Sequence, residues 1–387
     1  MLTPVNPSDL RIALFSGNYN GVRDGANQAL NRLVGYLLRQ GAHVRIYSPT
    51  IEDPAFAPTG DLVSVPSVPI PLRSEYRLSL GMPLRVRRDL AKFDPNIIHI
   101  SSPDVSAHRA VSWARARNLP AVASIHTRFE TYLTYYHLQL LEPTLRAGLR
   151  RLYRRCDALL APAESMAAVL RAQRMNSNIH IWTRGVDREQ FNPGRRDMGW
   201  RRGLGIADEE LAVMFLGRLV LEKGLDVFAA TITELKRRGV PHQPVVIGDG
   251  PAKAIFQEQM PTGLFIGQQI GEDLAKAVAS SDVFLNPSIT EAFGNVTLEA
   301  MACGLPVVAA AAVGTTSIVR NGETGTLVKP GDTNGFADAL EAYARDPELR
   351  RRHGEAGLAY AATMDWDEIN ASVLRVYESV IERRRRI

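Results

Sequence analysis

The stretch DVFLNPSITEAFGNVTLEAMACGLPVVAAA, residues 282–311, contains two short apolar runs separated by a longer segment. The runs 282–288 and 305–311 have the length and composition of buried β-strands. Between them lie a loop and the start of a helix, near residue 294. A strand followed by a helix and another strand is the unit from which parallel sheets are built.

The same alternation of apolar runs and helical patterns continues along the chain. It predicts strands at 11–16, 42–49, 96–102, 120–126, 158–163, 179–185, 211–217, 243–250 and 263–269, besides the two above. The rhythm restarts near residue 211, after a polar stretch (186–205) that reads as a linker. We therefore predict an α/β protein of two Rossmann-like domains facing each other across a cleft.

The predicted domains comprise residues 1–190 and 191–365. The last stretch, 366–387, is expected to be a helix that packs back on the first domain. Within it Val373, Val376, Val380 and Ile381 fall on one stripe at helical spacing, which indicates a buried face.

Composition restricts the class of protein. The 387 residues are 45% hydrophobic and 22% charged, as in a globular protein, and the two cysteines form no ligand spacing, which favours buried thiols in a reducing compartment. The formal charge of +5 and the tail ERRRR (382–386) suit nucleic acid, anionic lipid or a phosphate-bearing ligand. Since the chain carries no zinc-finger spacing and no aromatic RNA-binding signature, we expect no nucleic-acid partner.

The N-terminal sequence MLTPVNPSDLRIALF lacks the basic region and apolar run of a signal peptide. No segment reaches the ~18 consecutive apolar residues of a membrane-spanning helix. We therefore expect a cytoplasmic protein, and a peripheral position on the inner face of the membrane stays open.

The segment FLGRLVLEKGLD (215–226) is a strand end, a loop with two cations and a helix. Arg218 offers a planar fork of donors and Lys223 a compact charge, a combination that suits a diphosphate. The alternative is a solvated Arg218 and a Lys223 that pairs with the neighbouring Glu222.

The segment EAFGNVTLE (291–299) places two carboxylates on either side of a helix start. A helix start binds anions through its N–H groups and its dipole, and a carboxylate accepts hydrogen bonds from a pair of hydroxyls. Glu291 and Glu299 would then each hold a vicinal diol. The alternative is a capping acid and a solvent-facing glutamate. The N–H groups concerned belong to Phe293, Gly294, Asn295 and Val296.

The segments GRLVLEKG, EAFGNVTLEAMACGLPVVA and GVDREQFNP resemble glycosyltransferase family 4, whose retaining enzymes have the GT-B fold and use nucleotide-activated sugars. The resemblance implies that Arg218 and Lys223 bind the donor diphosphate, Glu291 the sugar hydroxyls and Glu299 the ribose. It implies an acceptor side in the first domain and a nucleotide-sugar site in the second. The donor is a substrate, so we expect no cofactor and no metal, and DWD (365–367) is not taken as a metal-binding Asp-x-Asp.

The first half of the chain narrows the resemblance. Residues 18–49, 66–80 and 124–143 look like a subgroup that glycosylates lipids, including GDP-mannose-dependent mannosyltransferases and sulfoquinovosyl-diacylglycerol synthases. By this likeness Gly21 lets the chain pass close to the diphosphate, and His126 lies beside the transferring sugar. For a lone histidine at a strand end, the alternative is a hydrogen-bonded structural residue. The donor is expected to be a GDP- or UDP-hexose.

The resemblance implies a hexosyl transfer in which His126, Glu291, Arg218 and Lys223 take part, with a lipid or lipid-linked saccharide as acceptor. The segment TLRAGLRRLYRRCD (144–157) would bring the protein to an anionic membrane through its arginines and nearby Leu138, Leu140 and Leu141. Alternatively its leucines pack on their own sheet. A GT-B sugar-nucleotide epimerase, a non-catalytic sugar-nucleotide sensor and a transferase acting on a soluble saccharide are the competing functions.

Overall fold

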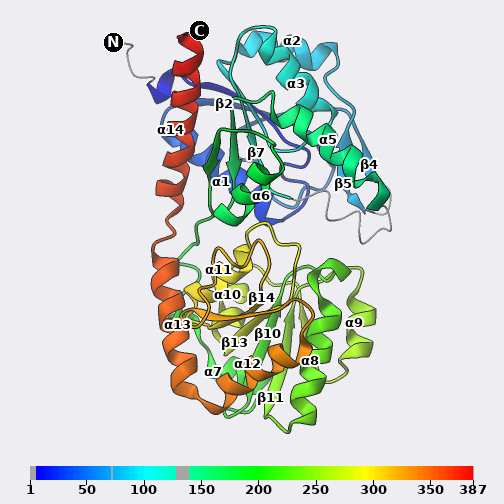
Figure 1. Cartoon of the computed structure of the whole chain (residues 1–387), viewed down its shortest axis with the longest axis vertical. Coiled ribbons are helices and arrows are strands. Elements are labelled where there is room, and N and C mark those ends of the chain that lie inside the picture. The colour runs from blue at the N-terminus through cyan, green and yellow to red at the C-terminus, as the bar shows by residue number, and fades with distance from the viewer. Residues whose placement is uncertain (1–5, 71–72, 128–138, 387) are drawn as a thin grey trace. The chain divides into compact units, whose positions relative to one another are not determined.

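The computed structural model describes residues 6–70, 73–127 and 139–386, and the chain divides into two units (Figure 1). Unit 1 comprises Met1–Arg184 and Trp366–Ile387, and unit 2 comprises Gly185–Asp365. The chain therefore passes between the units twice, after Arg184 and after Asp365. The C-terminal helix belongs to unit 1.

The described part of unit 1 has a seven-stranded parallel sheet in the order β3-β2-β1-β6-β7-β8-β9. The strands are β1 (Arg11–Phe15), β2 (His43–Ser48), β3 (Asp61–Ser64), β6 (Ile97–Ile100), β7 (Ala121–Ser124), β8 (Ala158–Ala161) and β9 (Ile179–Ile181). All six strands predicted for this half are present. Strand β3 was not predicted, because it is exposed or half-buried throughout and lacks an apolar run.

An antiparallel hairpin of β4 (Ser67–Ile70) and β5 (Arg73–Ser79) was also missed. Its strands contain a proline and several charged residues, so they lack the apolar runs from which strands are predicted. The helical elements of unit 1 are η1 (Pro7–Asp9), α1 (Gly25–Arg39), α2 (Leu84–Phe93), α3 (Val105–Arg115), η2 (Gln139–Leu141), α5 (Glu142–Tyr153), α6 (Glu164–Ala172) and α14 (Trp366–Arg385).

Helix α14, red in Figure 1, packs on α1 and on β8. The predicted stripe of Val373, Val376, Val380 and Ile381 is buried, and it joins the same apolar core as the inner face of α1. At the other end of α14, Asp367 forms an ion pair of 2.6 Å with Arg39 of α1. The prediction of a C-terminal helix with one buried face is confirmed.

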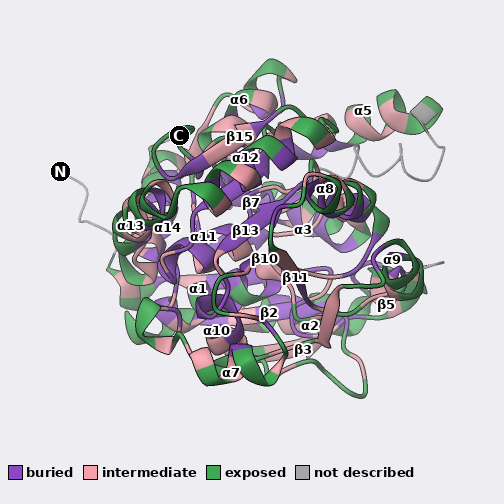
Figure 2. Ribbon diagram, turned by 90° about the horizontal axis from the view of Figure 1, so that it is seen from below, coloured by how far each residue is buried: buried purple, intermediate pink, exposed green. Residues whose placement is uncertain are grey.

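The described part of unit 2 has a six-stranded parallel sheet in the order β12-β11-β10-β13-β14-β15. The strands are β10 (Leu211–Leu216), β11 (His242–Ile247), β12 (Leu264–Gly267), β13 (Val283–Asn286), β14 (Val307–Ala310) and β15 (Gly325–Val328). Strands β10 and β13 are adjacent and buried, and they appear purple in Figure 2. The loops that follow them therefore leave the sheet side by side.

Helices cover the sheet of unit 2 on both sides. They are η3 (Pro193–Arg195), α7 (Met198–Gly203), η4 (Leu221–Lys223), α8 (Leu225–Arg237), α9 (Lys253–Gln259), α10 (Gly271–Ala279), α11 (Asn295–Ala302), α12 (Thr333–Arg345) and α13 (Pro347–Ala362). The edge strand β15 was not predicted, since its four residues include only two with apolar side chains.

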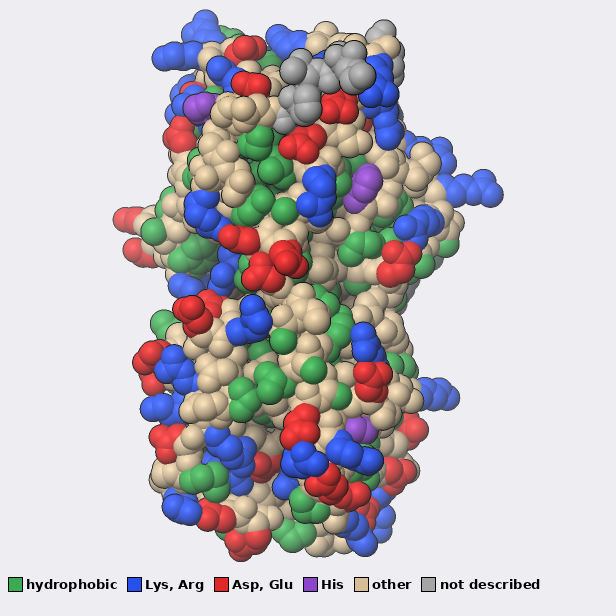
Figure 3. Space-filling model, turned by 90° about the vertical axis from the view of Figure 1, so that its left-hand side faces the viewer, with side chains coloured by type: hydrophobic (Ala, Val, Ile, Leu, Met, Phe, Trp, Pro, Cys, Tyr) green, Lys and Arg blue, Asp and Glu red, His purple; other side chains and the backbone are tan. Residues whose placement is uncertain are grey.

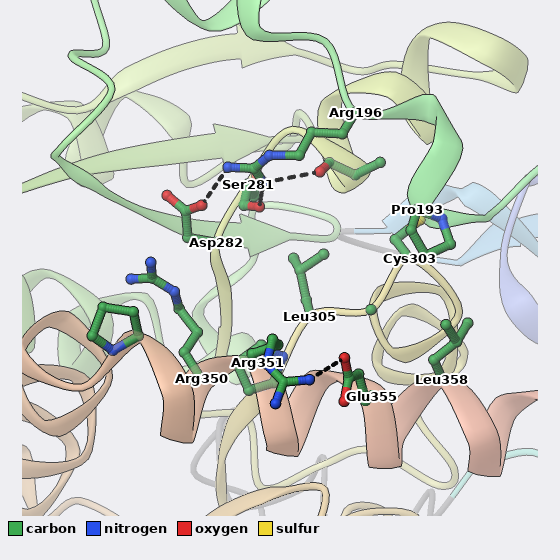
Figure 4. Close-up of a pocket in the computed structure, with 14 residues that line it drawn as sticks. Pro193, Arg196, Ser281, Asp282, Cys303, Leu305, Arg350, Arg351, Glu355 and Leu358 are labelled. Carbon is green, nitrogen blue, oxygen red and sulfur yellow. Dashed lines mark hydrogen bonds and ion pairs between the residues drawn. The ribbon is translucent and has the colours of Figure 1, made fainter.

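Residues 186–205, which the sequence suggests as a linker, are instead packed on unit 2. The fully buried guanidinium of Arg201 donates to the carbonyl of Ser280 at 2.9 Å and to the carboxylate of Asp282 at 2.8 Å. Arg196 donates to the carbonyl of Ser281 at 2.6 Å (Figure 4). The linker prediction from polar composition is therefore wrong. These arginines form hydrogen bonds with residues 280–282, just before β13.

The same contacts line a cavity of about 480 Å³ between Arg196, Leu305 and Arg350 (Figure 4). It lies where β13 and β14 begin, at the opposite edge of the sheet from the loops predicted to bind the donor. Its charged side chains are largely paired with one another: Arg196 with Asp282, and Arg351 with Glu355. We therefore treat this cavity as separate from the candidate site.

None of the described helices combines the length and apolar character that crossing a bilayer requires. Cys156 and Cys303 are both buried and free, as predicted. On the face shown in Figure 3, basic and acidic side chains are interspersed.

Candidate functional site

In unit 2 the two predicted donor-binding segments meet. Lys223, at the end of η4, forms an ion pair with Glu291 on the loop after β13, although the two residues are far apart in sequence. Lys223 is therefore not paired with Glu222, as the alternative interpretation required. The side chains of Lys223 and Glu291 are 26% and 14% exposed, so the pair is only partly shielded from solvent.

Hydrogen bonds fasten the two segments together beneath this ion pair. The backbone carbonyl of Glu222 accepts hydrogen bonds from the hydroxyls of Thr290 at 3.1 Å and Ser288 at 3.5 Å. At the end of β13, Asn286 donates its side-chain amide to the hydroxyl of Thr297 in α11 at 3.3 Å. These contacts fix the backbone from which Lys223 and Glu291 project.

Arg218 lies on a loop held by its neighbours at the same edge of the sheet. The amide of Leu219 donates to the carbonyl of Asp249, and the carbonyl of Leu219 accepts from the amide of Ala252, both at 3.0 Å. A Cβ at Gly248 would lie 1.9 Å from the carbonyl oxygen of Gly217, so only glycine allows the two loops this close. The half-buried Arg218 side chain therefore starts from a restrained backbone.

Helix α11 begins at a glycine in the left-handed conformation. Gly294 is the N-cap, with a φ of 100°, and its carbonyl accepts from the amides of Thr297 and Leu298. Asn295 and Val296 then form the first helical turn, whose N–H groups point away from the helix in any α-helix. The helix start is thus where the sequence predicts it, directly after the buried Phe293.

The two acids of EAFGNVTLE lie on different elements. Glu291 is on the loop, next to Lys223, and Glu299 is on α11, beyond its first turn and half-buried. The carboxylate of Glu299 adds to burial in raising the pKa of the Cys303 thiol to about 12. Each acid is therefore at one side of the helix start, and the assignment of one to a sugar and the other to ribose stays a prediction.

In unit 1, Gly21 lies on the loop between β1 and α1. The atoms nearest to an added Cβ would be those of the Ile51 side chain, at 3.5 and 3.7 Å, which is ordinary contact. Its φ is not in the left-handed region. Packing within unit 1 therefore does not account for a glycine here, and its proximity to a diphosphate stays a prediction.

His126 follows β7, at the carboxyl edge of the unit 1 sheet. Its Nε2 lies 2.8 Å from the hydroxyl of Ser124, and its Nδ1 accepts from Nη2 of Arg184 at 3.0 Å. The ring also meets Trp182 edge-on, with centroids 5.5 Å apart. Burial, followed by the charge of Arg184 and by His99, holds the pKa of His126 well below its usual value.

The residues around His126 were missed by sequence reasoning. Trp182 and Arg184 follow β9, and Ser124 ends β7, so all three come from strand ends on the carboxyl edge. The guanidinium of Arg184 also stacks on the Trp182 ring at 4.7 Å and donates to the carbonyl of Trp182 at 2.7 Å. The available signal was the pattern WTRG (182–185), the last four residues of the strand predicted at 179–185.

The basic segment 144–157 corresponds to α5, which ends at Tyr153. Leu149 and Leu152 are buried, which agrees with the interpretation that this helix packs on its own sheet. Arg150 and Arg154 donate to the carbonyls of Gln173 and Arg174, both at 3.0 Å. Structural contacts thus occupy part of the arginine cluster, and Arg155 adds a third by donating to the Ser112 hydroxyl at 2.6 Å.

Next to α5, Leu140 is 95% exposed and Leu141 is 52% exposed, and Arg151 is exposed as well. Leu138, which the sequence analysis grouped with them, lies outside the described residues. The Asp-x-Asp pattern at 365–367 is divided between the two units, and Asp367 is paired with Arg39.

Comparison with known sequences matches both units to glycosyltransferase families. The model described as Glycosyltransferase Family 4 matches residues 23–190, and the one described as Glycosyl transferases group 1 matches residues 210–346. The chain is 32% identical to the sulfoquinovosyl transferase SQD2 of Arabidopsis thaliana, over 92% of this chain and 71% of that protein. It is 31% identical to a GDP-mannose-dependent alpha-mannosyltransferase of Corynebacterium glutamicum, over 98% and 91%.

Among solved structures, the chain is similar to a sucrose-phosphate synthase from Thermosynechococcus elongatus. The TM-score is 0.78 at 22% sequence identity, with 96% of this chain and 99% of that one covered. This likeness confirms the GT-B fold that the sequence predicts.

Proposed function

This chain belongs to glycosyltransferase family 4, and we propose that it moves a hexosyl unit from a GDP- or UDP-sugar to a hydroxyl acceptor, with retention of the anomeric configuration. The observation that carries the proposal is the meeting of Lys223 and Glu291 at two adjoining loops on the carboxyl edge of the unit 2 sheet. Ligands of open α/β sheets bind at this edge. A cation, a carboxylate and a helix start there match a diphosphate with an attached sugar.

In the proposed reaction the bond between the sugar and the diphosphate breaks, and negative charge grows on the leaving diphosphate. Lys223, Arg218 and the amides at the start of α11 stabilise that charge, which is greatest in the transition state. Lys223 is paired with Glu291 in the ligand-free chain. The donor would therefore exchange partners with this pair: its phosphate takes Lys223 and its sugar hydroxyls take Glu291.

His126 is not suited to transfer the acceptor proton. Both ring nitrogens are in contact with groups of unit 1, and its pKa is held low. We infer that the leaving phosphate oxygen receives the acceptor proton on the same face of the sugar. No side chain is assigned as a covalent nucleophile, and the charge compensation given to Lys223 and Arg218 makes the proposed reaction independent of a metal.

The first test is thermal stabilisation by a panel of UDP- and GDP-hexoses, because a ligand that binds only the folded chain raises its unfolding temperature. GDP-mannose is the first candidate, since one relative is named for it. NMR of the product should show the donor's anomeric configuration, and EDTA should leave the rate unchanged. An inverted product contradicts retention, and an altered sugar formed from the donor alone indicates an epimerase.

We further propose that the acceptor is a membrane lipid or a lipid-linked saccharide. Two observations support this: the sequence resemblance of residues 18–49, 66–80 and 124–143 to a subgroup that glycosylates lipids, and the exposed group of Leu140, Leu141 and Arg151. An arginine near an anionic surface contributes ~1 kcal/mol, screened by salt. The protein should therefore sediment with vesicles that contain anionic lipid, and less so in high salt.

The variant Leu140→Ser with Arg151→Glu should lose vesicle binding and keep donor binding. It spares the arginines that hold unit 1 together. Arg352→Glu, an exposed arginine of α13, is the matched control. If the wild type never sediments with vesicles, or if the double variant binds as it does, a soluble saccharide becomes the better acceptor.

A further inference from the structure

A chain of polar side chains runs through unit 1 from the C-terminal helix to His126. The hydroxyl of Tyr377 in α14 lies 2.6 Å from Nδ1 of His99 in β6, and Nε2 of His99 lies 2.8 Å from the hydroxyl of Ser124. That hydroxyl also contacts Nε2 of His126, whose Nδ1 meets Arg184. Four elements far apart in sequence therefore meet in one hydrogen-bonded chain.

The chemistry of Arg184 fixes the protonation of His126. A guanidinium only donates hydrogen bonds, so Nδ1 of His126 must accept at this contact. A proton on Nδ1, in either the other neutral tautomer or the imidazolium, would set two donors against each other at 3.0 Å. The form that satisfies the contacts is the neutral ring with its proton on Nε2, which donates to Ser124.

The surroundings make this arrangement costly to change. Tyr377 and His99 are fully buried, and Ser124 and Arg184 are each 3% exposed, so a lost partner would not be replaced freely by water. Burial lowers the pKa of His99 to about 3 and raises that of Tyr377, which keeps both groups neutral. Arg184 and His99 are the titratable groups that act on His126 among the described residues.

We propose that Arg184 and Ser124 are positioning residues that hold His126 as the neutral Nε2–H tautomer, and that His99 and Tyr377 anchor Ser124 to the C-terminal helix. The inference rests on the proposed function for its consequence. Positive charge develops on the sugar as the diphosphate leaves, and an imidazolium beside it would repel that charge. A neutral ring in one fixed orientation would not.

The direct test is NMR of the histidine ring nitrogens, which reports protonation and tautomer without any substrate. The His126 signals are identified by their absence in His126→Gln. We expect His126 to remain the neutral Nε2–H form from pH 8 to pH 5.5. An Nδ1–H or doubly protonated ring at pH 7 in the wild type overturns the proposal.

Arg184→Gln removes the positive charge next to His126. It also replaces a side chain that can only donate hydrogen bonds with one that can donate or accept them. The Nδ1–H tautomer of His126 should then become populated, because a glutamine carbonyl can accept a hydrogen bond, and the pKa of the ring should rise, because one cause of its lowering is gone. The kcat should fall about tenfold, as expected for loss of positioning, with the donor KM changed less than twofold. Arg184→Lys keeps a charged donor and should recover part of kcat. Unchanged ring signals together with unchanged kcat in Arg184→Gln would contradict the proposal.

Tyr377→Phe tests the far end of the chain. Its matched control is Tyr343→Phe in unit 2, where a fully buried tyrosine hydroxyl lies 2.7 Å from Nδ1 of His353. Both variants lose one buried tyrosine–histidine hydrogen bond, but only Tyr377→Phe should change the His126 signals and lower kcat. Equal effects would reduce Tyr377 to a stabilising role.

The two proposals fail in different ways. If the ring of His126 behaves as expected and no hexosyl transfer occurs with any donor, the arrangement of the side chains stands and the proposed function falls. If transfer occurs and the ring is protonated at pH 7, the reverse holds.

Discussion

The candidate residues of the two units leave their sheets at equivalent places, after parallel strands, yet their surroundings differ. In unit 1, His126 is held by internal hydrogen bonds on both ring nitrogens. In unit 2, Lys223 and Glu291 form a partly exposed ion pair between two loops. His126 is an uncharged group with a fixed orientation. Lys223 and Glu291 are opposite charges that a ligand can separate by breaking their ion pair.

This difference indicates a division of labour in the proposed reaction. A buried neutral network gains nothing by rearranging, because each lost hydrogen bond leaves an unsatisfied group. A partly exposed ion pair contributes little stability, so a ligand bearing both charges and hydroxyls can replace it. We therefore expect binding and charge stabilisation to come from unit 2, and orientation of the sugar from unit 1.

Removal of the Lys223 side chain should have the largest effect on turnover. Lys223→Ala should lower turnover roughly a hundredfold, the size expected when one group that stabilises transition-state charge is lost. Steady-state kinetics with a saturating acceptor would measure this change. Lys236→Ala, an exposed lysine on the neighbouring helix α8, is the control. Wild-type turnover in Lys223→Ala would contradict the assignment of Lys223 to the diphosphate. It would also contradict the division of roles between the two units.

A smaller effect should follow from Glu299→Ala, which tests binding apart from chemistry. The loss of partners for a pair of ribose hydroxyls should weaken donor binding by ~1–3 kcal/mol. Calorimetry with the normal donor and with an analogue lacking the ribose hydroxyls should show a loss only for the former. Glu258→Ala, exposed on α9, serves as control. Equal losses for both donors would remove Glu299 from the ribose role.

The unit 1 network should appear in the pH dependence of stability. The pKa of His99 is lowered by burial from 6.5 to about 3, so below pH 6.5 the unfolded chain binds a proton that the folded chain does not. The free energy of unfolding should therefore fall as the pH falls from 6.5 toward 3, by up to ~1.4 kcal/mol per pH unit from this residue. His99→Gln should have a shallower slope.

This prediction can be measured for unit 1 by itself. Of the four tryptophans only Trp200 belongs to unit 2, so Trp200→Phe leaves fluorescence that reports unit 1. Urea unfolding in that background, at several pH values, gives the slope. His43→Gln, at an exposed histidine of β2, should keep the slope of the parent. An unchanged slope in His99→Gln would show that the network is not held neutral by burial.

The smallest effect concerns the ion pair of unit 2 without ligand. A double-mutant cycle of Lys223→Ala and Glu291→Ala should give a coupling of ~0.2–1 kcal/mol in unfolding free energy, decreasing with salt. Arg201 and Asp282, a buried pair in the same unit, provide the contrast and should couple more strongly. A Lys223–Glu291 coupling as large as that of the buried pair would mean that this pair is structural.

The strands with apolar runs could be predicted from the sequence because their residues are buried on both faces, as in LAVMFL of β10. Strands β3 and β15 could not, because each has only two apolar side chains among its four residues. Helix α14 was predictable from its valine stripe. The packing of residues 186–205 was not, since a buried arginine such as Arg201 looks like a solvated one until Asp282 is placed beside it.

The candidate site also has features that the sequence predicts and features that it does not. Segments such as EAFGNVTLE could be placed at a helix start from local spacing and resemblance. The contact of Lys223 with Glu291 depends on β10 and β13 being neighbours, which no local pattern specifies. The partners of His126 come from β7 and β9, and their anchor Tyr377 comes from the far end of the chain. Sequence spacing carries no information on such long-range contacts.

The double passage of the chain between the units bears on how the protein is synthesised. Unit 2 is one continuous segment, Gly185–Asp365, and can complete its core once that segment has left the ribosome. Unit 1 begins first and is completed last, because α14 supplies part of its core and the hydroxyl that contacts His99. During translation, the apolar surface of unit 1 that α14 covers therefore stays exposed until residues 366–386 have been synthesised.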